Sequence, residues 1–501
     1  MHRPNILLIL TDQTRLSAIS SYGDTPCRTP NVDRIRDKGI LFRNAYTSCP
    51  LCSPARASIM TGQFPHNHGI TANVGDLGCM LGNLPDSPEL LSRRLERAGY
   101  ACGYSGKWHL GDHHERWRSN GYIAGDPALG GCTLPRDVGF QGQNFAGHGG
   151  GGFKYQEYRD YLAEHGWEHR PVQKDGYTFL DQPAEATVPY FLADHTIGLI
   201  DRMVTEAREK PFFMWHNFWG PHEPYLTTDE CLDMYRDVAM PEWPSFRWPA
   251  EREPGPHAVK LTHSGADKPA WSHYEKLLRQ YYGFMSLIDA QIGRIYDHLE
   301  RNDLLRNTVV IFTADHGETL GSHGGLMDKG FHHFDEIQRI PFIVRMPDGS
   351  RAGEEMEEFV SLLDVYPTVL DYAGTSYNEA HADGRTIRPL LEGAKSGWRD
   401  QIVVEFNGVN GGLATLRTIR YRNFKYGFSL GWPEQLYDLD RDPDELHNLA
   451  EDAAFADVVR DMRSRLVNWM EETHDGAILL ARGAMQRSDG MRRRQTTESR
   501  I

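Results

Sequence analysis

Hydrophobic residues along the chain gather into short continuous runs, which are separated by longer polar and glycine-rich stretches. Runs of this kind are typical of strands buried on both faces of a parallel sheet. They predict strands at residues 5–11, 39–42, 100–104, 211–215, 309–314 and 341–344. Between the runs, apolar residues recur at helical spacing, which predicts helices at 90–98, 191–208 and 271–301 and one that begins at 365. The pattern indicates an α/β fold with a large mixed, mostly parallel sheet flanked by helices.

The pattern changes near residue 400. Short alternating segments predict a small antiparallel sheet with strands at 402–406, 414–420, 423–428 and 435–439. A predicted helix over 451–472 carries an apolar face suited to pack across this sheet. We therefore expect an α/β domain over 1–395, a small α+β subdomain over 396–475 and a basic tail over 476–501. We interpret the tail as a loose or intersubunit arm of a homo-oligomer.

Residues 112–195 show the least regular pattern of hydrophobic and polar positions in the chain. We interpret them as an insertion on the substrate side. The glycine run at 149–152 lacks the preceding strand and following helix of a phosphate-binding loop. His195 lies on the apolar stripe of a predicted helix, so we expect it to be structural.

Side chains that can bind metal ions or transfer protons follow several of the predicted strands. They are Asp12 and Gln13, Lys107 and His109, His222, and Asp315 and His316, with Lys329 further downstream. The carboxyl ends of parallel strands meet at one edge of a sheet, so we expect these residues to lie close together. Plainer interpretations stay open for single residues: Asp12 as a helix cap, Lys107 as a solvated loop residue and His109 as a cap.

Residues 49–62 read as a loop that leads directly into a short helix. Pro54 suits the first helical turn, and Gly62 is a natural left-handed end. Cys52 is thereby placed at a helix N-terminus, where free N–H groups favour a bound anion, and Arg56 adds a positive charge one turn later. The alternative is a small buried cysteine beside a surface arginine.

Composition narrows the function classes. The net charge of −15 over 501 residues argues against a nucleic-acid partner, although a metal and a few basic residues can still make one pocket positive. No apolar run is long enough to span a membrane. Seven scattered cysteines indicate reduced thiols, and the first apolar run is too short for a signal peptide. We expect a cytoplasmic protein, or a periplasmic one if a signal was removed.

Residues 52–56 (Cys-Ser-Pro-Ala-Arg) resemble the Cys-x-Pro-Ser/Ala-Arg signature of the type I sulfatases, a family within the alkaline phosphatase superfamily. The likeness continues through residues 61–66 (Thr-Gly-Gln-Phe-Pro-His). Residues 106–109 resemble the family's second signature, Gly-Lys-aromatic-His, and 315–318 resemble its Asp-His/Asn-Gly-Asp/Glu segment. The resemblance implies an alkaline-phosphatase-like fold over nearly the whole chain.

The resemblance also implies a chemistry. In the family the cysteine, here Cys52, is converted by a formylglycine-generating enzyme to formylglycine, whose hydrate is the nucleophile. The positions matching Asp12, Gln13, Asp315 and His316 bind one divalent cation together with that residue. Oxygen donors favour Ca²⁺, and the softer His316 leaves Mn²⁺ or Mg²⁺ open.

The remaining roles follow from the same resemblance. Arg56, Lys107 and Lys329 would neutralise charge on the transferred group, and Asp315 would accept a proton. His222 would protonate the leaving group, and His109 would take the proton from the second hydroxyl. The function expected is hydrolysis of a sulfate ester of a sugar or small organic alcohol. The alternatives are a phosphonate monoester or phosphodiester hydrolase with the same machinery, and a non-catalytic binder that keeps the Cys52 thiol.

Overall fold

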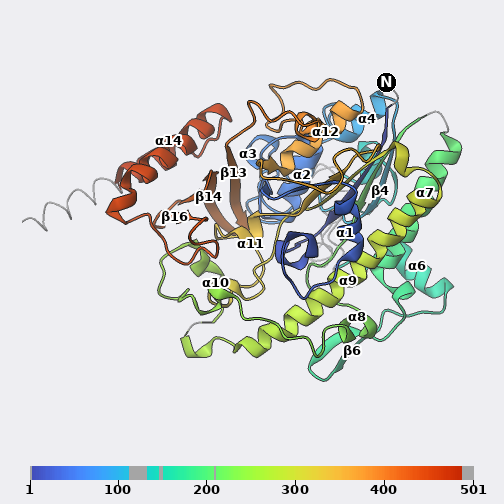
Figure 1. The fold of residues 1–501 in the computed structure, drawn as a ribbon, viewed down its shortest axis with the longest axis horizontal. Coiled ribbons are helices and arrows are strands. Elements are labelled where there is room, and N and C mark those ends of the chain that lie inside the picture. Colours follow the sequence, from blue (N-terminus) through green and yellow to red (C-terminus); the bar gives the residue numbers. More distant parts are fainter. Residues whose placement is uncertain (1–2, 112–132, 146–150, 208–209, 264, 488–501) are drawn as a thin grey trace, which may run out of the picture.

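The computed structural model describes residues 3–111, 133–145, 151–207, 210–263 and 265–487. Its main feature is an eight-stranded sheet with the strand order β11-β2-β10-β9-β1-β8-β4-β5 (Figure 1). The strands are β11 (Glu354–Met356), β2 (Ile40–Phe42), β10 (Phe342–Arg345), β9 (Thr308–Ala314), β1 (Asn5–Thr11), β8 (Phe212–Asn217), β4 (Ala101–Gly106) and β5 (Gln141–Gly142). Only β10 runs against its neighbours within this sheet, which makes the sheet mixed and mostly parallel, as predicted.

Both faces of this sheet are covered, and β1 shows how one strand serves both. Ile6, Leu8 and Leu10 belong to one hydrophobic cluster, whereas Leu7 and Ile9 belong to the other. The alternation follows from the two-residue period of a strand. The first cluster packs under α2 (Cys52–Thr61), α4 (Leu91–Arg97) and α12 (Val365–Tyr372). The second packs under α1 (Pro30–Asp37), α7 (Val188–Glu206) and the long α9 (Trp271–Arg301), and α7 lies along α9 in Figure 1.

The C-terminal part forms a separate antiparallel sheet in the order β13-β14-β15-β16, with α14 packed on it (Figure 1). These elements are β13 (Gln401–Val409), β14 (Gly412–Tyr421), β15 (Phe424–Ser429), β16 (Gln435–Asp438) and α14 (Ala456–Glu472). Met462 and Leu466 of α14 are buried against Ile419 and Tyr426 of the sheet. This is the small α+β unit that the alternating pattern predicts.

The first part of the predicted tail differs from a loose arm, because residues 478–487 are helical and bury Ala481 and Met485 in the C-terminal core. The rest of the tail (488–501) and two pieces of the predicted insertion (112–132 and 146–150, with half of the glycine run) lie outside the described residues. The described part of the insertion holds α6 (Gln156–Glu164) and the hairpin β6 (Pro171–Lys174) and β7 (Tyr177–Leu180).

The smaller elements are short segments that carry too few residues for a clear period. They are β3 (Ala45–Tyr46), α3 (Pro65–His68), α8 (Asp229–Asp233), α10 (Ser322–Gly325), α11 (Asp335–Gln338), β12 (Val360–Ser361) and α13 (Arg388–Leu391). Within the described residues, no helix combines the length and apolar character needed to cross a lipid bilayer. The cysteines in the same part of the chain are free thiols.

His66 of α3 joins the large unit to the C-terminal sheet. Its Nδ1 lies 2.5 Å from Glu405 Oε2, and its Nε2 lies 3.1 Å from the Thr473 carbonyl oxygen. Both ring nitrogens face acceptors, an arrangement that only the protonated imidazole satisfies. Burial alone would lower the pKa of His66, but the Glu405 carboxylate raises it above its ordinary value. Burial alone would raise the pKa of Glu405, but the charge of Arg417, together with His66, lowers it to about 2.

We predict that His66→Gln lowers the free energy of unfolding by about 1–3 kcal/mol near pH 6, because it removes a charged hydrogen bond. A raised folded-state pKa gives a stabilisation that is complete below the unfolded value of about 6.5 and is lost as pH rises through the folded value. The difference between wild type and variant in urea unfolding should therefore shrink as the pH rises above about 6.5. A difference that does not change with pH would contradict this account.

Candidate active site

Helix α2 places Cys52 at its first residue, as predicted. Leu51 before it is extended, and the helix ends where Gly62 adopts a left-handed φ of 73° and donates its N–H to the Ser58 carbonyl oxygen at 2.8 Å. Ser53 Oγ donates to the His109 carbonyl oxygen at 2.6 Å, which fixes the start of α2 against the loop after β4. Cys52 is only 1% exposed, so the helix N-terminus opens into the interior.

The parallel strands deliver the charged side chains to the same place. Thr11 of β1 lies opposite Ala314 of β9, so Asp12 and Asp315, the next residue of each strand, emerge side by side. On the other side of β1, Gly106 of β4 lies opposite Asn217, the last residue of β8. A Cβ on Gly106 would lie 1.6 Å from the Asn217 carbonyl oxygen, so only glycine brings the following Lys107 this close.

Asp12, Cys52, Asp315 and His316 form a buried cluster in which one ligand atom of each lies within 4.8 Å of the others. Cys52 Sγ is 3.3 Å from His316 Nε2 and 3.8 Å from Asp12 Oδ1. His316 Nδ1 contacts the Gly317 carbonyl oxygen at 2.9 Å, so that nitrogen carries the proton and Nε2 keeps its lone pair for the cluster. Burial lowers the pKa of His316, which favours this neutral form. The donor set fits a divalent cation.

Arg56 holds the two carboxylates together. Its Nη2 lies 3.0 Å from Asp12 Oδ2 and from Asp315 Oδ2, and its Nε donates to the same Asp315 oxygen at 3.1 Å. Its Nη1 donates to the Lys107 carbonyl oxygen and to Asn217 Oδ1. Every donor position of this fully buried guanidinium thus faces the protein. The geometry makes Arg56 a positioning residue, whereas the sequence expectation had it facing the transferred group.

Lys107 supplies a second buried positive charge. Its Nζ lies 2.5 Å from Asp12 Oδ2. Burial alone would raise the pKa of Asp12, but Lys107 and Arg56, among other nearby positive charges, hold it well below its ordinary value. Asp12 is therefore an ionised carboxylate whose Oδ1 faces Cys52.

Gln13, His222 and Lys329 form the other side of the site. Lys329 Nζ contacts Gln13 Oε1 and lies 2.9 Å from His222 Nε2. Burial alone would lower the pKa of Lys329, yet Asp328, with Cys52 and others, raises it well above its ordinary value. His222 Nδ1 contacts the Glu223 carbonyl oxygen at 2.7 Å, so its Nε2 is the acceptor that faces Lys329. His109 is 4% exposed, and its carbonyl oxygen accepts the hydrogen bond from Ser53 Oγ at the start of α2.

Two residues of the site carry no sequence prediction of their own. Asn217 ends β8, and its position at the carboxyl end of a strand was an available signal. Glu318 is fully buried and accepts hydrogen bonds from Gln13 Nε2 and from Tyr225 Oη at 3.2 Å. Glu318 is the last residue of the family-like segment 315–318, but the sequence assigns it no role of its own.

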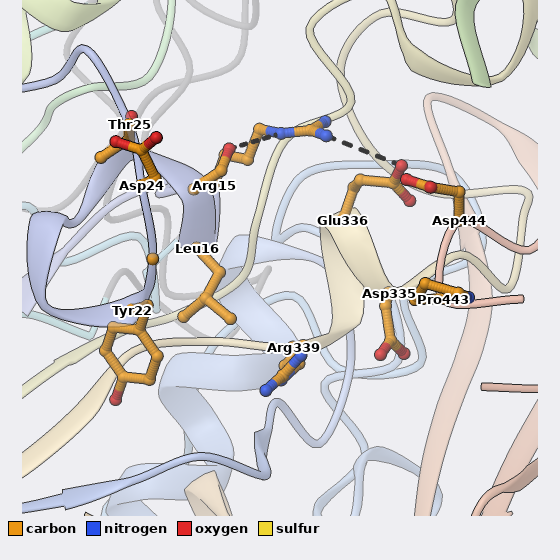
Figure 2. Close-up of a pocket in the computed structure, with 12 residues that line it drawn as sticks. Arg15, Leu16, Tyr22, Asp24, Thr25, Asp335, Glu336, Arg339, Pro443 and Asp444 are labelled. Carbon is orange, nitrogen blue, oxygen red and sulfur yellow. Dashed lines mark hydrogen bonds and ion pairs between the residues drawn. The ribbon is translucent and has the colours of Figure 1, made fainter. Parts of the chain in front are cut away.

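Two cavities lie near these residues. One of about 480 Å³ is bounded by Glu223 and Asp328, the neighbours of His222 and Lys329, and by apolar side chains such as Leu277 and Met327. The other, of about 260 Å³, is drawn in Figure 2, where the Arg15 guanidinium and the Glu336 carboxylate face each other at 3.7 Å. The second cavity contains none of the predicted site residues, so we assign it no part in the chemistry.

Comparisons with known proteins show the family to which the chain belongs. The family model described as "Sulfatase" matches residues 4–375. The model described as "N-sulphoglucosamine sulphohydrolase, C-terminal" matches residues 321–472.

Individual relatives cover nearly the whole chain. The "Uncharacterized sulfatase YidJ" of Escherichia coli is 29% identical, over 95% of this chain and 88% of its own length. The "Multifunctional alkaline phosphatase superfamily protein PehA" of Trinickia caryophylli is 30% identical, over 94% of this chain and 95% of its own length. The crystal structure of the phosphonate monoester hydrolase of Agrobacterium radiobacter superposes with a TM-score of 0.79 at 27% identity, covering 94% of this chain and 96% of that one.

Replacing Arg56 tests how much the buried cluster depends on charge compensation. We predict that Arg56→Met lowers the free energy of unfolding by about 3–5 kcal/mol, because it leaves two buried carboxylates without their shared partner. Urea unfolding of the full chain measures the effect.

Arg34→Met is the matched control. Arg34 also contacts two carboxylates, those of Asp297 and Glu300, but its side chain is 33% exposed. An exposed pair of this kind contributes at most about 1 kcal/mol. Equal losses in the two variants would contradict the assigned role of Arg56.

Proposed function

Because the chain belongs to the sulfatase family, within the alkaline phosphatase superfamily, we propose that it hydrolyses the sulfuric ester of a small organic alcohol or sugar. The observation that carries this proposal is the buried cluster of Asp12, Cys52, Asp315 and His316 at the ends of β1 and β9 and at the first residue of α2. Cationic side chains surround the cluster, which suits an anionic group that must enter a protein of net charge −15.

In this proposal Cys52 acts after conversion to formylglycine by a formylglycine-generating enzyme. The hydrated aldehyde would supply the nucleophilic hydroxyl, and a divalent cation would polarise that hydroxyl and a sulfate oxygen. Asp12, Gln13, Asp315, His316 and residue 52 are the proposed cation ligands. Ca²⁺ is favoured by the carboxylate and amide oxygens, with Mn²⁺ or Mg²⁺ as alternatives because of the imidazole.

The remaining side chains would hold charge and protons. Lys107 and Lys329 would stabilise negative charge on the transferred group, where fixed donors in a dry site have their largest effect. His222, whose Nε2 lies 2.9 Å from Lys329 Nζ, would in its protonated form give a proton to the leaving oxygen, while Lys329 keeps its charge. Asp315 would accept the proton of the hydroxyl of residue 52 that attacks sulfur. His109 would then accept the proton of the second hydroxyl, in the step that releases sulfate.

The leaving group would occupy the cavity of about 480 Å³ beside His222 and Lys329, a volume within the range of small-molecule pockets. This size favours a mono- or disaccharide sulfate, an aryl sulfate or another small ester over a polymer. We further propose that hydrolysis takes place in the cytoplasm, from the odd and scattered cysteines of the sequence.

A second candidate function is hydrolysis of phosphonate monoesters. It is favoured by the TM-score of 0.79 with a phosphonate monoester hydrolase that shares 27% of its residues with this chain. Sulfate esters and phosphonate monoesters both present a tetrahedral anion to the same cationic side chains. The geometry of the site is therefore compatible with either substrate.

Maturation of Cys52 is the first test. We predict that protein co-expressed with a formylglycine-generating enzyme shows an aldehyde at residue 52 in peptide mass spectrometry, and that Cys52→Ala abolishes hydrolysis of 4-nitrophenyl sulfate. Cys52→Ser is the control, because it keeps the fold and a hydroxyl but offers no thiol for that enzyme to convert. Full activity in protein whose Cys52 thiol is unmodified would refute the mechanism.

Substrate preference separates the two candidate functions. We predict a higher kcat/KM for at least one member of a panel of sugar, aryl and alkyl sulfates than for phenyl phosphonate monoesters. We also predict that Lys107→Ala lowers kcat for the best sulfate at least about hundredfold, because it removes a buried donor to the transferred group. Faster turnover of phosphonates than of every sulfate would favour the second function.

A further inference from the structure

The side-chain amide of Gln13 is held in one orientation by two carboxylates. Gln13 Nε2 donates to Glu223 Oε2 at 3.0 Å and to Glu318 Oε2. Burial raises the pKa of Glu318, but both of its oxygens already accept from O–H and N–H donors of Tyr225, Leu320 and Asp328. Because this carboxyl group acts as an acceptor on each oxygen, the amide presents its nitrogen to it. The carbonyl oxygen is then directed the opposite way, toward Lys329 Nζ and the site.

The two carboxylates differ in environment. Glu318 is 0% exposed, whereas the Glu223 side chain is 48% exposed, so water can replace only the bond to Glu223. A reversed Gln13 amide would bring its oxygen against the buried Glu318 carboxylate, with no water to separate the two acceptors. Glu318 is therefore the stronger of the two constraints.

Glu318 also fixes the segments that carry the neighbouring site residues. Its Oε1 accepts from the backbone N–H groups of Leu320 at 3.2 Å and of Asp328 at 2.5 Å, next to Lys329. Its Oε2 accepts from Tyr225 Oη at 3.2 Å, in the loop that carries His222. One buried carboxylate thus joins three segments: the end of β1, the loop at 221–226 and the turn at 318–329.

We propose that Glu318 is a positioning residue that sets the cation affinity of the site by locking the Gln13 carbonyl oxygen toward it. Glu318 lies outside the cluster of Asp12, Cys52, Asp315 and His316 and would act through Gln13. The inference rests on the proposed function insofar as that function requires a cation at Asp12, Gln13, Asp315 and His316. Removing a buried partner that orients a ligand commonly costs about 10–100-fold in metal affinity.

The test measures Ca²⁺ binding to the metal-free full chain by titration calorimetry, with Mn²⁺ in parallel. Glu318→Gln keeps the shape but can donate as well as accept, so it permits the Gln13 amide to reverse. We expect the dissociation constant to rise at least about tenfold. Activity on a sulfate ester should recover when the cation is raised to saturation. An unchanged dissociation constant would overturn the proposal.

A double-mutant cycle separates orientation from general loosening of the structure. If Glu318 acts through Gln13, then Glu318→Gln in a Gln13→Ala background should change the dissociation constant by less than about twofold. Additive effects of the two substitutions would show that Glu318 acts by another route. Should Glu318→Gln fail to fold, Glu318→Asp serves in the same cycle, since it withdraws the carboxylate from Gln13 by one methylene.

Glu223→Gln is the matched control, since it removes the other acceptor of the same amide. Its effect should be smaller than that of Glu318→Gln, and an equal or larger effect would overturn the assignment to Glu318. If the wild-type chain hydrolyses sulfate esters but the effects of the Glu318 and Gln13 substitutions on cation binding are additive, this inference is wrong and the proposed function stands. A wild-type chain that binds no divalent cation contradicts the cation part of the proposed function itself.

Discussion

The Arg56 guanidinium between the carboxylates of Asp12 and Asp315 is the contact on which the rest of the site depends. Two carboxylates placed side by side in a dry interior repel each other and lose their hydration, which is unfavourable without compensation. Arg56 contacts both, and Lys107 adds a second charge on Asp12. With this compensation the protein can keep two carboxylate ligands beside Cys52 without exposing them to water.

The fold explains why these groups meet. The register of β1 against β9 fixes Asp12 beside Asp315, and the β4–β8 register brings Lys107 to the opposite flank. Helix α2 begins beside this edge, with Cys52 as its first residue and Arg56 one turn later. A single helix thereby provides both the reactive position and the charge that makes its surroundings stable. The loops that carry His222 and Lys329 complete the outer side of the site.

Much of this arrangement could be predicted from the sequence. Continuous apolar runs identified β1 and β9, and the position of Asp12 and Asp315 directly after them predicted their meeting at one sheet edge. Pro54 and Gly62 predicted the bounds of α2. The antiparallel direction of β10 could not be predicted, because a run buried on both faces has the same pattern in either direction.

The direction in which the side chains of Arg56 and Glu318 point could not be predicted from the sequence either. Arg56 follows a family-like motif, but only the structure shows that its donors are fully taken by Asp12, Asp315, Asn217 and a main-chain oxygen. Glu318 ends the family-like segment 315–318, but only the structure shows that five hydrogen-bond donors converge on it. Networks of this kind depend on contacts between segments far apart in the chain, which local spacing does not record.

The central claim is that the ends of β1 and β9 and the start of α2 form one cation site around residue 52. Anomalous diffraction from crystals grown with Mn²⁺ tests it most directly, because Mn²⁺ is an accepted substitute in an oxygen-rich site and is identified by its own signal. The account predicts one strong peak bounded by Asp12, Asp315, His316 and residue 52. A peak elsewhere in the chain, with Arg56 and Lys107 alone filling the space between the carboxylates, would contradict it.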